Sequence, residues 1–154
     1  MSKNKLSKNF AVSEILVSKD HPELIQDYVP TTQELLIAQV LALSILQPIR
    51  DEFGVTNILS WLRPEPLNTA IGGSKTSDHI LGAAADFYVS DKSLDRIYQS
   101  IFENKNIPYK QMILYPDHGF IHISCNTPIS NYRHRDSKVK KGNNYIDYKD
   151  YITQ

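Results

Sequence analysis

The sequence contains almost no cysteine, since Cys125 is the only one among 154 residues. A single cysteine excludes an internal disulfide and any zinc cluster built from several thiolates, so a zinc site would need histidine and carboxylate ligands. A chain of this length buries about two-thirds of its unfolded surface without disulfides or a structural metal. Any bound metal would therefore serve the function of the protein rather than hold the fold together.

A surplus of charge and a long apolar run are also missing. The 17 basic and 17 acidic residues give a formal net charge of zero, so we expect no nucleic-acid partner and no attraction to an anionic membrane. The basic start, MSKNKLSKNF, is followed by no apolar run of signal-peptide length, and no stretch approaches the roughly 20 apolar residues of a membrane span. We therefore expect neither a signal peptide nor a membrane span.

Two segments have the periodicity of helices. Thr31 and Glu34 have the spacing of a capping box, and the apolar residues after them predict a largely buried helix that ends near Gly54. Pro48 is expected to kink the last turn of this helix, because proline lacks the N–H group that the helix needs. Residues 94–102 have apolar side chains on one face, as in a surface helix that packs on a sheet.

Three segments are expected to be strands. Residues 83–89 form one strand, and residues 111–115 and 120–125 form a hairpin, because the PDHG sequence between them is rich in turn residues. Side chains alternate along a strand, so Ile121 and Ile123 would face the core and His122 would lie on the opposite face.

Two stretches have no regular pattern. The proline- and glycine-rich RPEPLNTAIGGSKTSDH is expected to be a long irregular loop, which is itself a hint of function. From Asn126 onward apolar residues thin out, while Tyr, Lys and Arg accumulate. We therefore expect one folded domain over residues 1–127 and a basic, Tyr-rich tail over residues 128–154. That tail is either solvated and partly disordered or a contact surface for a polyanion or a protein partner.

Three potential metal ligands converge on this map: His79 at the end of the loop, Asp86 in the following strand, and His122 in the hairpin. Two histidines and one carboxylate form a recognised catalytic zinc set that leaves a position for water, and zinc assists amide hydrolysis at neutral pH. Asp86 lies in the apolar GAAADFYV, where an ionised carboxylate is costly unless it is paired or metal-bound. The alternative is that both histidines are ordinary hydrogen-bonded residues and Asp86 caps a turn, since the chain has no HExxH motif.

A longer pattern runs through the same region. The stretch LRPEPLNTAIGGSKTSDHILGAAADF, followed by QMILY and GFIHIS, resembles the M15 family of zinc D-Ala-D-Ala peptidases, especially its small phage- and virus-associated members. In that family a Tyr-Arg segment, an Asn, a Gly-Gly-Ser, a Ser-x-His, an Ala-Ala-Asp and a Trp-x-His-x-Ser recur in this order. Upstream, FAVSEILVS and LQPIRDEFG resemble the family's entry segment and first long helix, so the resemblance covers residues 10–124.

The resemblance implies an α+β fold of the hedgehog and D-Ala-D-Ala peptidase type, with a small antiparallel sheet, helices packed on one face and a zinc cleft on the other. It implies a zinc peptidase that hydrolyses peptide bonds in bacterial peptidoglycan stem peptides, as a D,D- or L,D-carboxypeptidase or an endopeptidase. A phage-encoded protein of this kind would be made in the bacterial cytoplasm and would act on the cell wall.

The resemblance also assigns residues. By position, the family's zinc ligands fall on the three residues singled out above. Arg63 is implied to hold a substrate carboxylate or to stabilise the oxyanion of the tetrahedral intermediate. Ser77 and Gln111 are expected in the substrate-binding site, where they and Ser124 would fix the ligands or the nearby backbone.

One position departs from the family pattern. Many M15 enzymes have a Glu or Asp three residues before the last histidine, which acts as the general base, but this chain has Gly119 there. Asp117 in the turn is the best substitute, with His118 and Glu65 as weaker candidates, and the alternative for Asp117 is a plain turn former. Without a base, the domain would be a zinc-binding but non-catalytic module that binds the cell wall, or a phage structural or interaction module.

Overall fold

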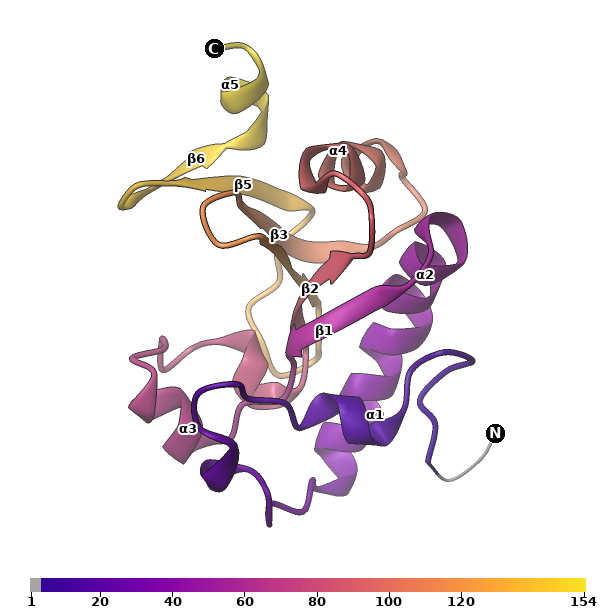
Figure 1. Ribbon diagram of the computed structural model, residues 1–154, viewed down its shortest axis with the longest axis vertical. Helices are drawn as coiled ribbons and strands as arrows, with labels where there is room; N and C mark the ends of the chain where they lie inside the picture. The colour runs from indigo at the N-terminus through magenta and orange to yellow at the C-terminus, as the bar shows by residue number, and fades with distance from the viewer. Residues whose placement is uncertain (1–3) are drawn as a thin grey trace.

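A computed structural model describes residues 4–154, so residues 1–3 of the basic start lie outside the described part (Figure 1). Its centre is a six-stranded sheet with the order β1-β2-β4-β3-β5-β6. The strands are β1 (Thr56–Ser60), β2 (Ala84–Val89), β3 (Tyr109–Tyr115), β4 (Phe120–Cys125), β5 (Asp136–Lys141) and β6 (Asn144–Asp147). All neighbours pair antiparallel except β3 and β5, which are parallel. The α+β class is confirmed, but the expectation of a purely antiparallel sheet is wrong because β5 joins β3 in the same direction.

The predicted long helix is present as α1 (Thr32–Leu41), a π-helical segment η3 (Ala42–Leu46) and α2 (Gln47–Phe53). Its N-terminus has the expected capping box, in which the Glu34 backbone N–H donates to Thr31 Oγ1 and the Thr31 N–H donates to Glu34 Oε1. The chain leaves the helix at Gly54, whose φ of 107° favours glycine. The departure from α-helical geometry lies just before Pro48, where the ring and the missing N–H disturb the preceding turn.

This continuous helix, Thr32–Phe53, has 22 residues and is long and apolar enough to cross a membrane by length and composition alone. The sequence-based expectation of no such stretch is therefore wrong for this segment. The inner face of the helix belongs to the hydrophobic core, with Leu41, Ile45 and Ile49 fully buried. A core helix of this kind meets the same length and composition criterion as a membrane span.

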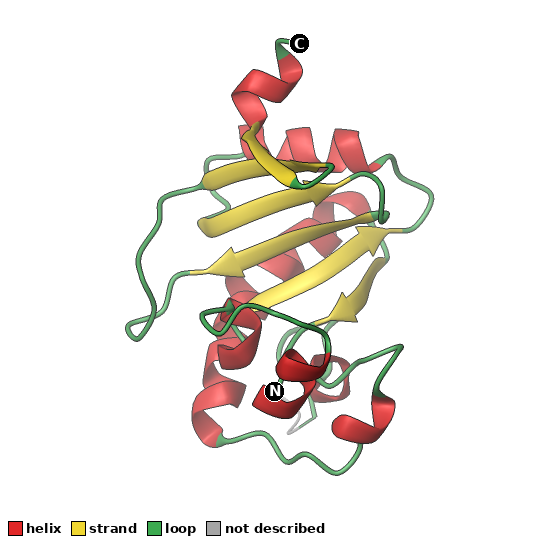
Figure 2. Cartoon of the chain, turned by 90° about the vertical axis from the view of Figure 1, so that its left-hand side faces the viewer, coloured by secondary structure: helices red, strands yellow, loops and turns green. Residues whose placement is uncertain are grey.

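Helix α4 (Leu94–Glu103) confirms the predicted amphipathic helix and packs on β2, β3 and β4 (Figure 2). Its buried Tyr98 hydroxyl lies 3.1 Å from the carbonyl oxygens of Met112 and Lys138, so one side chain links the helix to β3 and β5. The predicted hairpin is confirmed as β3 and β4, with Ile121 and Ile123 fully buried on the helix side of the sheet.

The expected irregular loop is more ordered than predicted. It contains the short helix α3 (Glu65–Ala70) and the 3₁₀ turn η4 (Asp78–Leu81). A proline lies in the first turn of α3, where a missing N–H costs nothing, so Pro66 starts a helix rather than breaking one. Two further 3₁₀ turns, η1 (Val12–Ile15) and η2 (Pro22–Leu24), precede α1.

The segment after residue 127 also differs from the expected tail. It adds β5, β6 and the helix α5 (Tyr148–Ile152) to the sheet. Val139 is fully buried in the core, and the Tyr148 ring packs 4.6 Å from Tyr98 and 4.9 Å from Phe102, measured between ring centroids. A few well-placed apolar and aromatic side chains thus order a segment whose average composition is polar.

Arg135 anchors this C-terminal segment. Its guanidinium donates to the carbonyl oxygens of Ile101 and Phe102 at the end of α4 and to that of Ile107. The same guanidinium lies 4.2 Å from the Tyr109 ring centroid. Cations are favourable at a helix C-terminus, where backbone carbonyls lack partners. Arg135 also has a φ of 50°, a conformation that asparagine tolerates.

We expect Arg135→Asn to lower the free energy of unfolding by about 2 kcal/mol, because the variant keeps a residue suited to this backbone but loses the charged hydrogen bonds. Urea denaturation measures the loss. Arg96→Asn, at an exposed position of α4, is the matched control and should change stability by less than about 0.5 kcal/mol. Equal stability of the two variants would show that the Arg135 contacts contribute nothing.

Candidate metal centre

The sheet brings two of the predicted ligands side by side. Asp86 on β2 pairs with His122 on β4, and their side chains lie on the face opposite α4. The third residue, His79, reaches them from the turn η4. One nitrogen of each histidine and one oxygen of Asp86 all lie within 4.8 Å of one another. The structure therefore gathers into one cluster all three residues that the sequence predicted as metal ligands.

The orientation of His79 is set by its surroundings. Its Nδ1 lies 2.7 Å from the carbonyl oxygen of Trp61, which can only accept a hydrogen bond, so Nδ1 carries a proton. Its Nε2 then faces Asp86 Oδ1 at 3.2 Å. Ser77 caps the turn, because its hydroxyl accepts from the His79 backbone N–H at 3.2 Å. A carbonyl partner on one ring nitrogen directs the other nitrogen toward the cluster, the usual arrangement of a metal-binding histidine.

Asp86 holds a buried negative charge. Its Oδ1 lies 3.2 Å from His79 Nε2 and 3.0 Å from His122 Nδ1, and its residue surface is 8% exposed. Burial alone would raise the pKa of Asp86, but the two imidazoles hold it well below its ordinary value. Burial in turn lowers the pKa of His79, although Asp86 opposes this. A cation between these side chains would compensate the carboxylate, as the sequence pattern led us to expect.

Arg63 lies beside the cluster in a tight cradle. Its Nη2 is 3.8 Å from Asp86 Oδ2, and its Nη1 is 3.4 Å from Asn68 Oδ1. Asn68 is held in turn by the carbonyl oxygen of Ser74, to which its amide donates at 2.9 Å. A Cβ at Gly73 would lie 2.1 Å from Asn68 Oδ1, so only glycine lets the loop close on this pair.

One donor of Arg63 is unused. Its Nε is buried and has no hydrogen-bond partner among residues 4–154. Burial lowers the pKa of Arg63 and the nearby Asp86 carboxylate raises it, but a guanidinium stays charged in either case. The guanidinium as a whole lines the cleft, where a cation is suited to an anionic group of a ligand.

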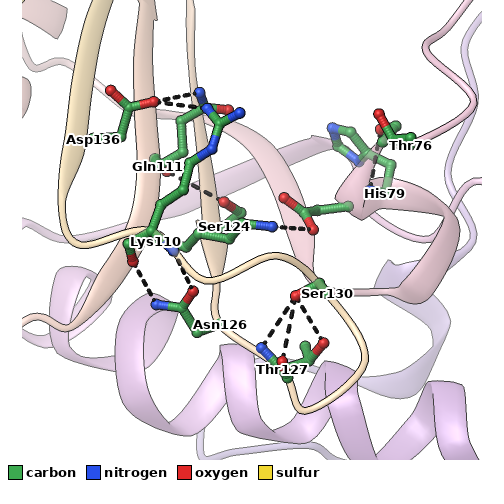
Figure 3. A network of polar contacts seen from close by, with 12 residues as sticks. Thr76, His79, Lys110, Gln111, Ser124, Asn126, Thr127, Ser130 and Asp136 are labelled. Carbon is green, nitrogen blue, oxygen red and sulfur yellow. Dashed lines mark hydrogen bonds and ion pairs between the residues drawn. The ribbon is translucent and has the colours of Figure 1, made fainter.

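The cluster lies in an open cleft of about 910 Å³. The cleft is also lined by the predicted residues Ser77 and Gln111, and Gln111 donates to Asp136 on β5 at 2.8 Å (Figure 3). Ser124 is fully buried beneath the cleft, and its hydroxyl lies 3.5 Å from the Gln111 carbonyl oxygen. The two motif serines thus contact the backbone near the ligands.

The structure does not bring the candidate general bases to the cluster. Asp117 and His118 are exposed in the turn between β3 and β4, and Glu65 is exposed in the first turn of α3. None of the three belongs to the cleft lining over the described residues. Gly119, at the position of the family carboxylate, has a φ of 77° and open space around it.

Sequence reasoning missed the buried ion pair between Lys110 and Asp78. Lys110 Nζ donates to Asp78 Oδ1 at 2.9 Å, and both side chains are nearly buried (Figure 3). This pair ties the turn that carries His79 to β3. Lys110 also lies where the pairing of β3 with β4 shifts register, so no alternation pattern could place its side chain. Asn68 was likewise missed, although an asparagine belongs to the resembling motif.

One family model, described as Peptidase M15, matches residues 8–124 and so contains all three cluster residues and Arg63. The matched segment ends before β5, β6 and α5. Comparison with curated proteins gives no match.

We expect the purified protein to bind one Zn²⁺ and His79→Ala to weaken this binding at least 100-fold. A direct ligand contributes more than the residues that hydrogen-bond to ligands, which are worth about 10- to 100-fold. Calorimetry measures the affinity. Zinc at about 100 times its Kd should stabilise the wild type by about 2.7 kcal/mol, and chelation should remove this gain. His118→Ala, an exposed histidine outside the cleft, is the matched control. Unchanged zinc affinity in His79→Ala would exclude this cluster as the site.

Proposed function

The chain belongs to the M15 peptidase family, and on that premise we propose that it is a zinc peptidase of the hedgehog and D-Ala-D-Ala peptidase type. Its proposed substrates are the stem peptides of bacterial peptidoglycan, cut as a D,D- or L,D-carboxypeptidase or as an endopeptidase. The observation that supports this function is the cluster of His79, Asp86 and His122, whose ligand atoms lie within 4.8 Å of one another. This cluster lies in an open cleft within the matched segment.

The donor set fits zinc. Two imidazole nitrogens and one carboxylate oxygen, with solvent access from the cleft, are the ligands of a catalytic rather than a structural zinc site. When bound, zinc would act as a Lewis acid on the scissile carbonyl and would make water a better nucleophile. The Trp61 carbonyl keeps the coordinating nitrogen of His79 free of its proton. Asp86 would supply the negative charge that a divalent cation requires.

Arg63 is proposed to hold the substrate. Its place in the cleft lining beside Asp86 supports contact of the guanidinium with the carboxylate of a peptide end or with the oxyanion that develops during hydrolysis. Asn68 and Gly73 would fix the guanidinium before substrate arrives, so little ordering would remain to be done on binding.

The aromatic wall of the cleft supports a peptide substrate. Tyr115 and Phe120 stack with ring centroids 4.5 Å apart, and both line the cleft next to His122. Such a surface packs against the apolar parts of a peptide, while the polar residues opposite it fix orientation. We further propose, from the resemblance to phage-associated members, that the protein is made in the bacterial cytoplasm and acts on the cell wall.

We expect the zinc-loaded protein to cleave purified muropeptides, and Arg63→Ala to lower kcat/KM by about 100- to 1000-fold, the usual loss for one oxyanion donor. Mass spectrometry of the digest identifies the bond, and a carboxypeptidase would release one residue. Arg96→Ala, an exposed arginine on α4, should retain full activity. Intact muropeptides at all tested pH values with stoichiometric zinc would contradict the peptidase function.

A second candidate function is a metal-binding but non-catalytic module that binds the cell wall or serves in phage structure or interaction. One observation favours it: within residues 4–154, the carboxylates that line the cleft are Asp78, Asp86 and Asp136. Asp78 is paired with Lys110, Asp136 contacts Gln111, and Asp86 belongs to the cluster itself. The cleft therefore lacks a separate carboxylate beside the cluster that could accept a proton.

Substitution of Asp117 tests whether the turn between β3 and β4 supplies the general base of the proposed peptidase. A general base contributes about 100- to 10,000-fold to the rate, but Asp117 is exposed outside the cleft lining. We therefore expect Asp117→Ala to retain kcat within about threefold of the wild type, like the exposed control Asp20→Ala. A loss of 100-fold or more in Asp117→Ala alone would assign the base to the turn, as the sequence predicted.

A further inference from the structure

The cleft is positively charged although the chain as a whole is neutral. Five cationic and three anionic side chains line it, which are Arg63, Lys75, Lys110, Arg133 and Lys138 against Asp78, Asp86 and Asp136. A bound divalent cation would increase this excess. A cleft lined by an excess of one sign attracts ligands of the opposite sign. The charge therefore points to a substrate with more than one negative group.

Two of these cations come from outside the segment that the family model matches. Arg133 Nη1 lies 2.9 Å from Asp136 Oδ2, and Lys138 Nζ lies 3.7 Å from Asp136 Oδ1. Gln111 donates to the same Asp136 Oδ2. One carboxylate thus holds two cations together, and each cation retains N–H groups that this contact does not use.

The loop that leads to β5 is fixed rather than loose. Asn126 Nδ2 donates to the Arg133 carbonyl oxygen at 2.8 Å, and the Arg133 N–H donates to Asn126 Oδ1 at 3.0 Å (Figure 3). Lys138 also pairs with Asp147 on β6, and this hydrogen bond raises the pKa of Lys138. Lys138 therefore stays protonated at neutral pH, and both cations are held in place before a ligand arrives.

The register of the sheet gives the distance from the metal-ligand cluster. Ile113 pairs with His122 on one side and with Lys138 on the other. Two strand spacings therefore separate Lys138 from His122, which is about 10 Å. An extended peptide spans this distance in about three residues.

We propose that Arg133 and Lys138 form a subsite for a carboxylate of the peptide substrate, about three residues from the bond cleaved at the cluster. This inference rests on the proposed peptidase function and names a feature of its substrate. Stem peptides carry such a group, because their glutamate is linked through its side chain and leaves its α-carboxylate free. An uncharged amide at that position would offer no negative charge to the N–H groups that the two cations do not use for Asp136 and Asp147.

The test uses the pentapeptide L-Ala-γ-D-Glu-L-Lys-D-Ala-D-Ala and the same peptide with a carboxamide in place of the glutamate α-carboxylate. We expect the wild type to prefer the carboxylate form by about tenfold in kcat/KM. Lys138→Gln should lose this preference through a lower rate on the carboxylate form, with the rate on the amide form unchanged. Arg133→Gln, at a more exposed position, should act in the same direction and covers the case in which Lys138→Gln fails to fold.

Lys141→Gln is the matched control, because it removes the same charge from the same strand on the opposite face. It should keep the wild-type preference. Equal rates of the wild type on both peptides would overturn the subsite, as would an equal loss on both peptides in Lys138→Gln.

A binding measurement separates this inference from the proposed function. In a His122→Ala background, which removes one proposed ligand, calorimetry compares the affinities of the two peptides without hydrolysis. The carboxylate form should bind about tenfold more tightly, and adding Lys138→Gln should abolish the difference. If the His122→Ala protein binds the carboxylate form more tightly but the wild type cleaves neither peptide, the result would contradict the peptidase function and support the subsite. If the wild type cleaves both peptides equally well and the His122→Ala protein binds both equally tightly, the result would contradict the subsite but not the peptidase function.

Discussion

The carboxylate of Asp86 is the constraint on which the site depends. It lies in a strand whose neighbours Ala84, Ala85 and Phe87 are fully buried, where an unpaired charge would be very costly. Both imidazoles point at the same oxygen of this carboxylate. The sheet supplies one of them through strand pairing and the turn η4 supplies the other, so the arrangement requires the native fold. The cost of burying this charge explains why so many surrounding contacts orient the cluster.

Those contacts come from four different parts of the chain. Trp61, the residue after β1, provides the carbonyl that orients His79, and Arg63 lies two residues further along the chain. The ion pair of Lys110 and Asp78 holds η4 against β3, while α3 and Gly73 hold the guanidinium of Arg63. Each support is polar and lies close to the cluster. The hydrophobic core on the opposite face of the sheet provides the rigid base on which these contacts are built.

The sequence predicted the features that depend on local periodicity or on side-chain chemistry. The capping box of Thr31, the amphipathic α4, the β3–β4 hairpin and the placement of His122 opposite Ile121 and Ile123 all follow from residues near one another in the chain. The three cluster residues were found because a buried carboxylate demands compensation. The resemblance to M15 peptidases follows from ordered motifs that lie within one stretch of the chain, and the family model that matches residues 8–124 confirms it.

The features that sequence reasoning missed depend on contacts between distant residues. The pairing of Lys110 with Asp78 spans 32 positions, and the docking of Arg135 on the end of α4 spans 33 or 34. Strand β5 has one buried apolar residue, Val139, which is too weak a pattern to identify a strand. Asp117 was chosen for its chemistry and closeness in sequence to His122, but a tight turn directs its side chain to solvent. Composition averages over residues 128–154 concealed the few aromatic contacts that order them.

The parallel attachment of β5 to β3 has a consequence for the order of assembly. A nascent chain emerges from the ribosome with its N-terminus first, so all three cluster residues are available once residue 122 has appeared. The loop over residues 126–135 and β5 must follow before the far wall of the cleft can close. The pairing of β5 with β3 joins two strands that are separated in the sequence by β4 and this loop. The three cluster residues thus exist in the chain before the far wall of the cleft, and a chain that ended before β5 would carry them in a half-built cleft.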